Sequence, residues 1–293
     1  MKELDFRIVD VFTDTPLAGN QLAVVLNGEG LDEKRMLAIA REFNFSETTF
    51  VTRSERADCE FRVRIFTPAM ELPMAGHPTI GTAVVLNAEG LIGEATTFDL
   101  GVGPTPVRIG SGRAQMIQPN PTFRPPAAST EVIATALGIA LHDVGLPGLA
   151  PEIVQTGAPF LIVPVADREV LARLDPRRDA WLAAFSGPSH RAMYCFALGG
   201  ADPSASARCR MFAPHDGIPE DPASGSAAGP LGAYLARYSR PGEQKSSFLF
   251  EQGYEMGRPS RIEVEIERQG EEFTAIRVGG PAVIIARGVL ALP

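Results

Sequence analysis

Short apolar or alternating runs in the first half of the chain predict strands, and longer runs predict two helices. The predicted strands span residues 6–12, 21–26, 45–51 and 60–66, and the predicted helices span 31–43 and 77–87. The 31–43 segment repeats its apolar residues with the 3.6-residue period of an amphipathic helix. The 77–87 segment is apolar on most sides, which predicts a helix buried in a core.

The second half of the chain repeats this order loosely. Residues 156–165, TGAPFLIVPV, predict a turn and a buried strand. Further strands are predicted at 193–198, 209–212, 263–266 and 282–286, and helices at 180–185 and 227–238. Between the halves, residues 119–130 read PNPTFRPPAAST and predict a linker, because proline is excluded from central strands and helix interiors. We therefore expect one domain over 1–120, joined by a last strand at about 281–293, and a second over 127–280.

Two segments of the chain share one pattern. Residues 64–86 read RIFTPAMELPMAGHPTIGTAVVL, and residues 210–235 read RMFAPHDGIPEDPASGSAAGPLGAYL. Each runs Arg-x-Phe-x-Pro, a polar turn, a Gly beside His or Ser, and an apolar helix. An internal duplication explains this layout. It predicts two similar domains with a small-molecule site at their interface.

Composition limits the kinds of partner. At 293 residues, with 45% hydrophobic and 21% charged residues, the chain has the make-up of a globular protein. A net charge of −8 argues against a nucleic acid or an anionic membrane surface. The start, MKELDFRIVDVF, has no secretory pattern, and the three cysteines have no CxxC spacing, so we expect a cytoplasmic protein without disulfides or zinc.

Polar residues gather at the two predicted helix starts. Gly76 and Ser226 lie where free backbone N–H groups and the helix dipole attract anions. His77 and Asp221 lie at the same starts, where a neutral imidazole and a carboxylate suit proton relay or hydrogen bonding. The alternative is that Gly76 only forms a turn, Ser226 only caps its helix, and Asp221 only complements the dipole.

Glu47 lies in the apolar strand segment FSETTFV, between hydroxyl residues. A carboxylate desolvated in a half-buried strand has a raised pKa, which suits general acid–base catalysis. The alternative is an ordinary strand with Glu47 facing solvent. Because phosphate-binding loops, dinucleotide fingerprints, nucleophile elbows and HExxH are all lacking in the sequence, cofactor-free chemistry is expected.

These segments resemble the phenazine-biosynthesis PhzF-like family, which is related to diaminopimelate epimerase. The matching blocks are VDVFTDTPLAGNQLAVVL (9–26), SETTFV (46–51), RIFTPAMELPMAGHPTIGTA (64–83), TGAPFLIVPV (156–165) and GIPEDPASGSAAGPLGAYL (217–235). The resemblance implies an α/β (α+β) epimerase-like fold: two pseudo-symmetric domains, each a curved, mostly antiparallel sheet around a central helix, with the active site between them. It also implies a homodimer that needs no metal or coenzyme.

The resemblance also implies roles for individual residues. Glu47 corresponds to the proton-transferring carboxylate, with His77 and Asp221 as its catalytic partners. The implied substrate-binding residues are Asn20, Gly76, Gly225 and Ser226. The epimerases use two cysteines at positions that here are Ala75 and Ser224, so the resemblance implies a shuttle with one carboxylate.

The implied reaction is isomerisation of trans-2,3-dihydro-3-hydroxyanthranilate or a close analogue, a small ring substrate that carries a carboxylate and amino and hydroxyl groups. Two alternatives stay open. One is an isomerase or epimerase of another amino or hydroxy acid, outside phenazine pathways. The other is a binding protein that has kept the site and lost turnover.

Overall fold

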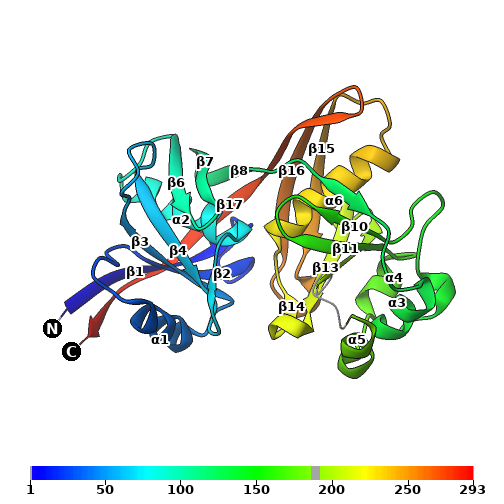
Figure 1. Ribbon diagram of the computed structural model, residues 1–293, viewed down its shortest axis with the longest axis horizontal. Helices are drawn as coiled ribbons and strands as arrows, with labels where there is room; N and C mark the ends of the chain where they lie inside the picture. The colour runs from blue at the N-terminus through cyan, green and yellow to red at the C-terminus, as the bar shows by residue number, and fades with distance from the viewer. Residues whose placement is uncertain (1, 186–191, 293) are drawn as a thin grey trace. The chain divides into compact units, whose positions relative to one another are not determined.

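The structure is a computed structural model that describes residues 2–185 and 192–292. The chain divides into two compact units (Figure 1). Unit 1 comprises residues 1–117 and 279–293, and unit 2 comprises residues 118–278. Each unit is built around one apolar helix.

Unit 1 is a closed ring of strands. Its elements are β1 (Lys2–Val11), β2 (Asn20–Val25), α1 (Glu33–Phe43), β3 (Glu47–Arg53), β4 (Phe61–Phe66), β5 (Glu71–Leu72), α2 (Gly76–Ala88), β6 (Ala95–Leu100), β7 (Gly103–Gly110), β8 (Arg113–Gln118) and the end of β17 (Glu272–Leu292). Pairing runs β1–β2–β3–β4–β6–β7–β8–β17 and returns to β1. The pairs β2–β3 and β4–β6 are parallel and the other registered pairs are antiparallel, so the sheet closes into a barrel.

Helix α2 is the core of unit 1. It contacts β1, β2, β3 and β7, and all its residues from Gly76 to Leu86 are buried. A side chain at Gly81 would meet methyl groups of Leu22 and Val11 at 2.7 Å, so the helix lies very close to β1 and β2. The amphipathic helix α1 covers part of the outer face through Met36, Ile39 and Ala40.

Unit 2 has its own strands and helices. They are β9 (Thr122–Arg124), α3 (Thr130–Leu137), η1 (Leu141–Asp143), β10 (Glu152–Gln155), β11 (Pro159–Pro164), α4 (Arg168–Ala172), α5 (Arg178–Ala184), β12 (Met193–Leu198), β13 (Ala207–Ala213), η2 (Pro214–Asp216), β14 (Ile218–Asp221), α6 (Gly225–Tyr238), β15 (Lys245–Gln252), η3 (Tyr254–Met256), β16 (Ser260–Gln269) and the start of β17. Helix α6 contacts β10, β11, β15 and β16. Residues of α3, α4 and α5, among them the fully buried Trp181, form a second core against β11–β13.

The two units repeat one pairing order. In unit 1, successive pairs along β1–β2–β3–β4–β6–β7 are antiparallel, parallel, antiparallel, parallel and antiparallel. In unit 2, successive pairs along β10–β11–β12–β13–β15–β16 have the same orientations in the same order. The predicted internal duplication is therefore visible in the topology, with α2 and α6 as equivalent helices.

The duplicated Arg-x-Phe motif has a structural reason. Residues two apart on a strand face the same side. Arg64 therefore lies over the ring of Phe66, at 5.1 Å, and Arg210 over that of Phe212, at 4.9 Å. Each arginine also forms a two-pronged salt bridge with a glutamate of the following short strand, Glu71 or Glu220.

The structure corrects several sequence-based boundaries. The predicted linker at 119–130 contains strand β9, which pairs with β10, so three residues between the prolines are part of the sheet edge. The strand predicted at 282–286 is part of β17, which has 21 residues. Strands β5, β6, β7, β8, β14 and β15 and helices α3 and α4 were not predicted.

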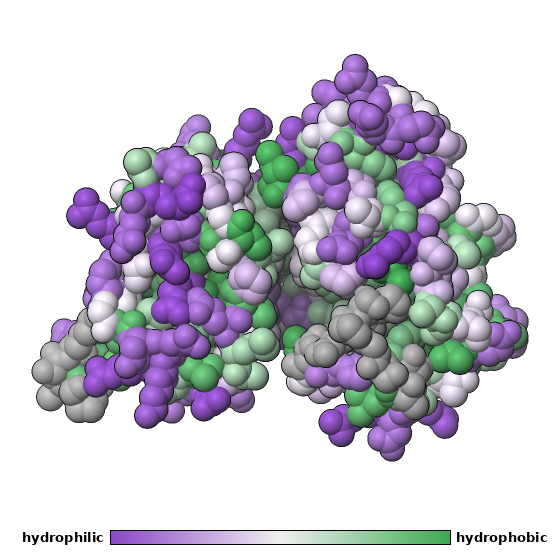
Figure 2. All heavy atoms as spheres, in the orientation of Figure 1, coloured by the Kyte–Doolittle hydropathy of each residue, from purple (hydrophilic) through white to green (hydrophobic). Residues whose placement is uncertain are grey.

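The face drawn in Figure 2 is covered with hydrophilic residues, between which hydrophobic residues appear in small separate groups. Scattered apolar residues are ordinary on a folded surface. In the part of the chain that the structure describes, none of the helices has the length and apolar character needed to cross a membrane.

Candidate functional site

The first cluster of predicted site residues lies at the start of α2. Gly76 opens the helix, and Ala75 at its N-cap provides no side-chain hydrogen bond. The first turn carries no acidic residue. The start of α2 therefore keeps backbone donors and dipole charge without a capping side chain, as an anion-binding helix end does.

Three side chains meet beside this helix start. Nε2 of His77 lies 3.3 Å from Oε2 of Glu47, and its Nδ1 lies 3.2 Å from Nδ2 of Asn20. Asn20 opens β2 and Glu47 opens β3. Because these strands are parallel, with Leu22 opposite Glu47, both residues reach the same end of the sheet. All three residues are buried.

Burial decides the charge of the imidazole. Desolvation lowers the pKa of His77 to about 3, against a smaller opposing effect of a backbone hydrogen bond at Gln21. The ring is therefore neutral at pH 7. The Asn20 amide donates to Nδ1 and accepts from the Ser46 hydroxyl at 3.1 Å, which leaves the ring proton on Nε2, facing the Glu47 carboxylate.

The second cluster lies at the start of α6. Asp221 ends β14 and is 8% exposed. Its Oδ2 accepts a hydrogen bond from the hydroxyl of Ser224, the N-cap residue of α6. The buried amide of Gln252 hydrogen-bonds both the Asp221 carbonyl and Ser224. Gly225 opens the helix, and Ser226 follows it, half-buried, in the first turn.

The predicted residues thus fall into two groups. Asn20, Glu47, Gly76 and His77 lie together in unit 1. Asp221, Gly225 and Ser226 lie together in unit 2. Two of the alternatives are wrong: Glu47 is buried rather than facing solvent, and the N-cap of α6 is Ser224 rather than Ser226.

Four polar residues of these clusters were not predicted to have a role. Ser46 adjoins Glu47 in the SETTF segment, so the hydroxyl residues around Glu47 were a usable signal. Ser224 was noted only as the residue at a cysteine position of the epimerases. Gln252 and Tyr194 come from strands β15 and β12, and neither stands in a motif. Gln252 and Tyr194 join the second cluster only through the long-range pairing of their strands.

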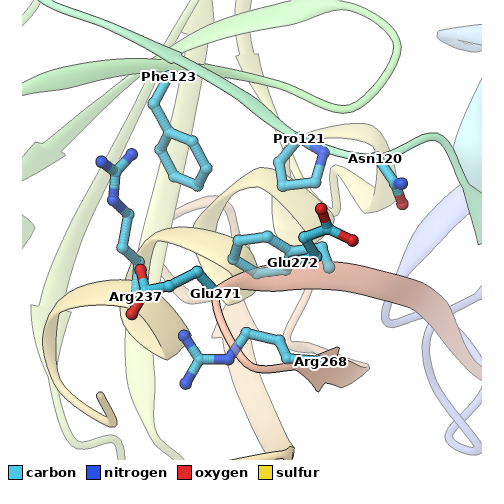
Figure 3. Close-up of a pocket in the computed structure, with 8 residues that line it drawn as sticks. Asn120, Pro121, Phe123, Arg237, Arg268, Glu271 and Glu272 are labelled. Carbon is cyan, nitrogen blue, oxygen red and sulfur yellow. The ribbon is translucent and has the colours of Figure 1, made fainter. Parts of the chain in front are cut away.

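A separate cavity of about 520 Å³ lies in unit 2 and contains none of the predicted residues (Figure 3). It is lined by Asn120, Pro121, Phe123, Arg237, Arg268, Glu271, Glu272 and Phe273. Arg237 lies 4.4 Å from the centre of the Phe123 ring, and Arg268 donates to the backbone carbonyls of Arg240 and Glu243. Arginine stays protonated at neutral pH, so Arg237 and Arg268 do not provide a proton shuttle.

Comparison with known proteins agrees with this architecture. The family model for phenazine biosynthesis-like proteins (PhzC-PhzF) matches residues 9–288. A solved phenazine biosynthesis protein of the PhzF family from Bacillus anthracis is 30% identical, with a TM-score of 0.92 and complete coverage of both chains. A hydroxyproline epimerase from Agrobacterium vitis, at 12% identity and a TM-score of 0.65, shares the fold alone. The predicted diaminopimelate epimerase-like fold is therefore confirmed.

Curated relatives cover nearly the whole chain. An uncharacterised isomerase of Mesorhizobium japonicum is 38% identical over 99% of both chains. The trans-2,3-dihydro-3-hydroxyanthranilate isomerase of Pseudomonas aeruginosa is 36% identical over 97% of this chain and 98% of its own length. Taken with the family match and the shared fold, these relatives show that the chain is an isomerase that belongs to the phenazine biosynthesis-like (PhzC-PhzF) family.

Proposed function

We propose that the protein isomerises a small ring substrate bearing a carboxylate and amino and hydroxyl groups, namely trans-2,3-dihydro-3-hydroxyanthranilate or a close analogue. The observation that carries this proposal is the buried contact of 3.3 Å between Glu47 and a neutral His77. The name of the Pseudomonas aeruginosa relative supports the choice of substrate.

In the proposed reaction, Glu47 is the base. Its carboxylate removes a proton from one ring carbon, so a C–H bond breaks, an O–H bond forms on Glu47, and the electron pair moves into the ring π-system. Glu47 then returns the proton to another ring carbon, and the double bond shifts. Atoms and electrons balance without a co-reactant, because substrate and product are isomers.

His77 controls the state of this base. Its Nε2 lies 3.3 Å from Oε2 of Glu47, so the imidazole borders the carboxylate without taking its proton. Burial keeps the ring neutral, and a neutral ring lies beside the carboxylate without the charge of an imidazolium. The Asn20 amide, placed between His77 and Ser46, holds the ring in this tautomer.

We assign the binding of the substrate's polar groups to the second cluster. The backbone of Gly225 and the hydroxyl of Ser226, at the start of α6, bind the carboxylate. This helix start has no side-chain cap and no acidic residue in its first turn, both of which favour an anion. Asp221 accepts a hydrogen bond from the substrate amine or hydroxyl.

The test is proton NMR in D2O with trans-2,3-dihydro-3-hydroxyanthranilate as the probe. The unmodified protein should consume the starting ring signals and place deuterium in the product. Glu47→Gln should lower the rate by roughly 10² to 10⁴-fold, the usual contribution of a general base. Glu42→Gln, a matched change at an exposed glutamate of unit 1, should retain full activity. Undiminished turnover by Glu47→Gln would refute the assigned role.

A second candidate substrate class is another amino or hydroxy acid. The 38%-identical relative is named only as an uncharacterised isomerase, which supports keeping this class open. Absence of turnover with trans-2,3-dihydro-3-hydroxyanthranilate, together with deuterium uptake into another acid, would favour this second class. Binding without any deuterium uptake would favour a catalytically silent binding protein.

We also propose that the protein is a homodimer, as the resemblance implies, and that it is cytoplasmic, as its cysteine usage suggests. Sedimentation equilibrium tests the dimer. A mass near 31.3 kDa, that of one chain, would contradict it.

A further inference from the structure

The fully buried amide of Gln252 is at the centre of the second cluster. Its Oε1 lies 3.1 Å from the backbone nitrogen of Ser224 and 3.0 Å from the hydroxyl of Tyr194. Its Nε2 lies 2.7 Å from the Asp221 carbonyl and 3.0 Å from Oγ of Ser224. A side-chain amide has two donor hydrogens and two acceptor lone pairs, so its hydrogen-bonding capacity is used completely.

Two backbone groups fix the orientation of this amide. The Ser224 N–H can only donate and the Asp221 carbonyl can only accept, so Oε1 must face Ser224 and Nε2 must face Asp221. Tyr194 must then donate to Oε1. Burial raises the pKa of Tyr194 well above its ordinary value, so its hydroxyl keeps the proton that this bond needs.

The direction of the remaining hydrogen bond follows. Oγ of Ser224 accepts from Nε2 of Gln252, so its own hydrogen points to Oδ2 of Asp221. An ionised carboxylate can only accept, which matches this donor. Asp221 is therefore held in one orientation by a chain of hydrogen bonds that runs from the core to its carboxylate.

The duplicated half of the protein shows that the fold does not need this chain of bonds. Aligning the two repeats at Gly76 and Gly225 places Ala75 opposite Ser224 and Leu72 opposite Asp221. The same strand, turn and helix form in unit 1 with these apolar residues. The polar groups of unit 2 thus need a reason other than folding of the repeat.

We propose that Ser224 and Gln252 are positioning residues that keep Asp221 ionised and correctly oriented to accept a hydrogen bond from the substrate. This inference rests on the proposed function, which assigns Asp221 to the substrate. Ser224 and Gln252 act through Asp221 and do not themselves contact the reacting atoms.

The experiment compares Ser224→Ala, Ser224→Thr and the control Ser246→Ala. Ser246 is another buried serine of unit 2, and its hydroxyl bonds Glu243 outside the cluster. With trans-2,3-dihydro-3-hydroxyanthranilate as the probe, Ser224→Ala should raise KM or lower kcat/KM by roughly ten- to a hundredfold, the value of one hydrogen bond to a charged group. Ser224→Thr keeps the hydroxyl donor and should restore most of this loss. Equal losses of kcat/KM in Ser224→Ala and Ser246→Ala would assign Ser224 a merely structural role.

A second measurement does not depend on turnover. Carbon-13 NMR of labelled aspartate follows the titration of Asp221, identified by its absence in Asp221→Asn. Loss of the Ser224 donor should move the titration midpoint to higher pH, and Ser224→Thr should move it back. An unchanged midpoint in folded Ser224→Ala would overturn the inference. Lack of turnover by the unmodified protein, with the shift present, would refute the proposed substrate and leave the positioning role intact.

Discussion

At the scale of single residues, burial determines the chemistry of the first cluster. His77 lies in the first turn of α2, and desolvation outweighs the hydrogen bond that favours its charged form. A solvent-exposed histidine in the same sequence would titrate near neutral pH and change its bond with Glu47 across the physiological range. The buried ring keeps one protonation state beside the carboxylate.

The neutral state of His77 predicts a pH-dependent stability. In the folded protein the pKa of His77 is lowered to about 3, from 6.5 in the unfolded chain. Between these values the unfolded chain binds a proton that the folded protein does not bind. The free energy of unfolding should therefore fall as pH decreases below about 6.5, by up to about 1.4 kcal/mol per pH unit from this group.

Urea unfolding at several pH values between 5 and 7.5 measures this effect. His77→Asn removes the titrating group, so its stability should fall less steeply toward acid than that of the unmodified protein. His142→Asn, at an exposed histidine, should keep the original slope. Parallel slopes for His77→Asn and the unmodified protein would show that His77 is not held neutral.

At the scale of elements, the duplicated salt bridges differ in their surroundings. The side chains of Arg64 and Glu71 are 20% and 32% exposed, whereas those of Arg210 and Glu220 are 8% and 17% exposed. Nη1 of Arg210 also donates to the carbonyls of Leu171, Ala172 and Leu174, at the end of α4. The second copy of the motif thus ties a helix to the sheet as well as one strand to the next.

Removal of the glutamate carboxylate should therefore lower the free energy of unfolding more in unit 2 than in unit 1. Glu220→Gln leaves a buried guanidinium without its counter-charge and should lower the free energy of unfolding by about 3 kcal/mol. The matched change Glu71→Gln, at the more exposed pair, should cost about 1 kcal/mol. Chemical denaturation of both variants provides the comparison. Equal losses of unfolding free energy in the two variants would mean that burial and the α4 contacts of Arg210 do not strengthen its salt bridge.

At the scale of the whole molecule, strand β17 belongs to both units. Its 21 residues begin in unit 2 and end in unit 1, where residues 282–292 pair with β1. Unit 1 is therefore discontinuous in sequence, and its ring of strands closes only through the last segment of the chain.

A truncation after Val278 should open unit 1. Without residues 279–293, β1 and β8 each lose a partner strand, and the amides of β1 should exchange with D2O as freely as those of a loop. The amides of β12 and β15, whose partners all lie in unit 2, should stay protected. Hydrogen-exchange mass spectrometry tests both statements.

The control is deletion of residues 292 and 293, which removes the terminal pair Lys2–Leu292 and leaves the other registered β1–β17 pairs in place. Protection of β1 should persist in this shorter deletion. Protection that also persists after truncation at Val278 would contradict closure of unit 1 by β17.

The sequence by itself determined the elements whose cause is local. Helices α1, α2 and α6 were predicted to within two residues at their ends, because the amphipathic period of α1 and the apolar runs of α2 and α6 directly reflect the surface they bury. The duplication was readable because both copies keep the Arg-x-Phe pair and the glycine at the helix start. The family resemblance then assigned Glu47, His77 and Asp221.

The tertiary structure decided what depends on distant partners. Strand β7 alternates in burial but includes two prolines, so its pairing with β6 and β8 was not visible in its composition. The contact of His77 with Glu47 and Asn20 requires the parallel pairing of β2 and β3 beside α2. Gln252 reaches Asp221 from 31 positions away, through a strand that carries no motif. Periodicity records what each segment buries, whereas register and long-range pairing decide which polar groups share that interior.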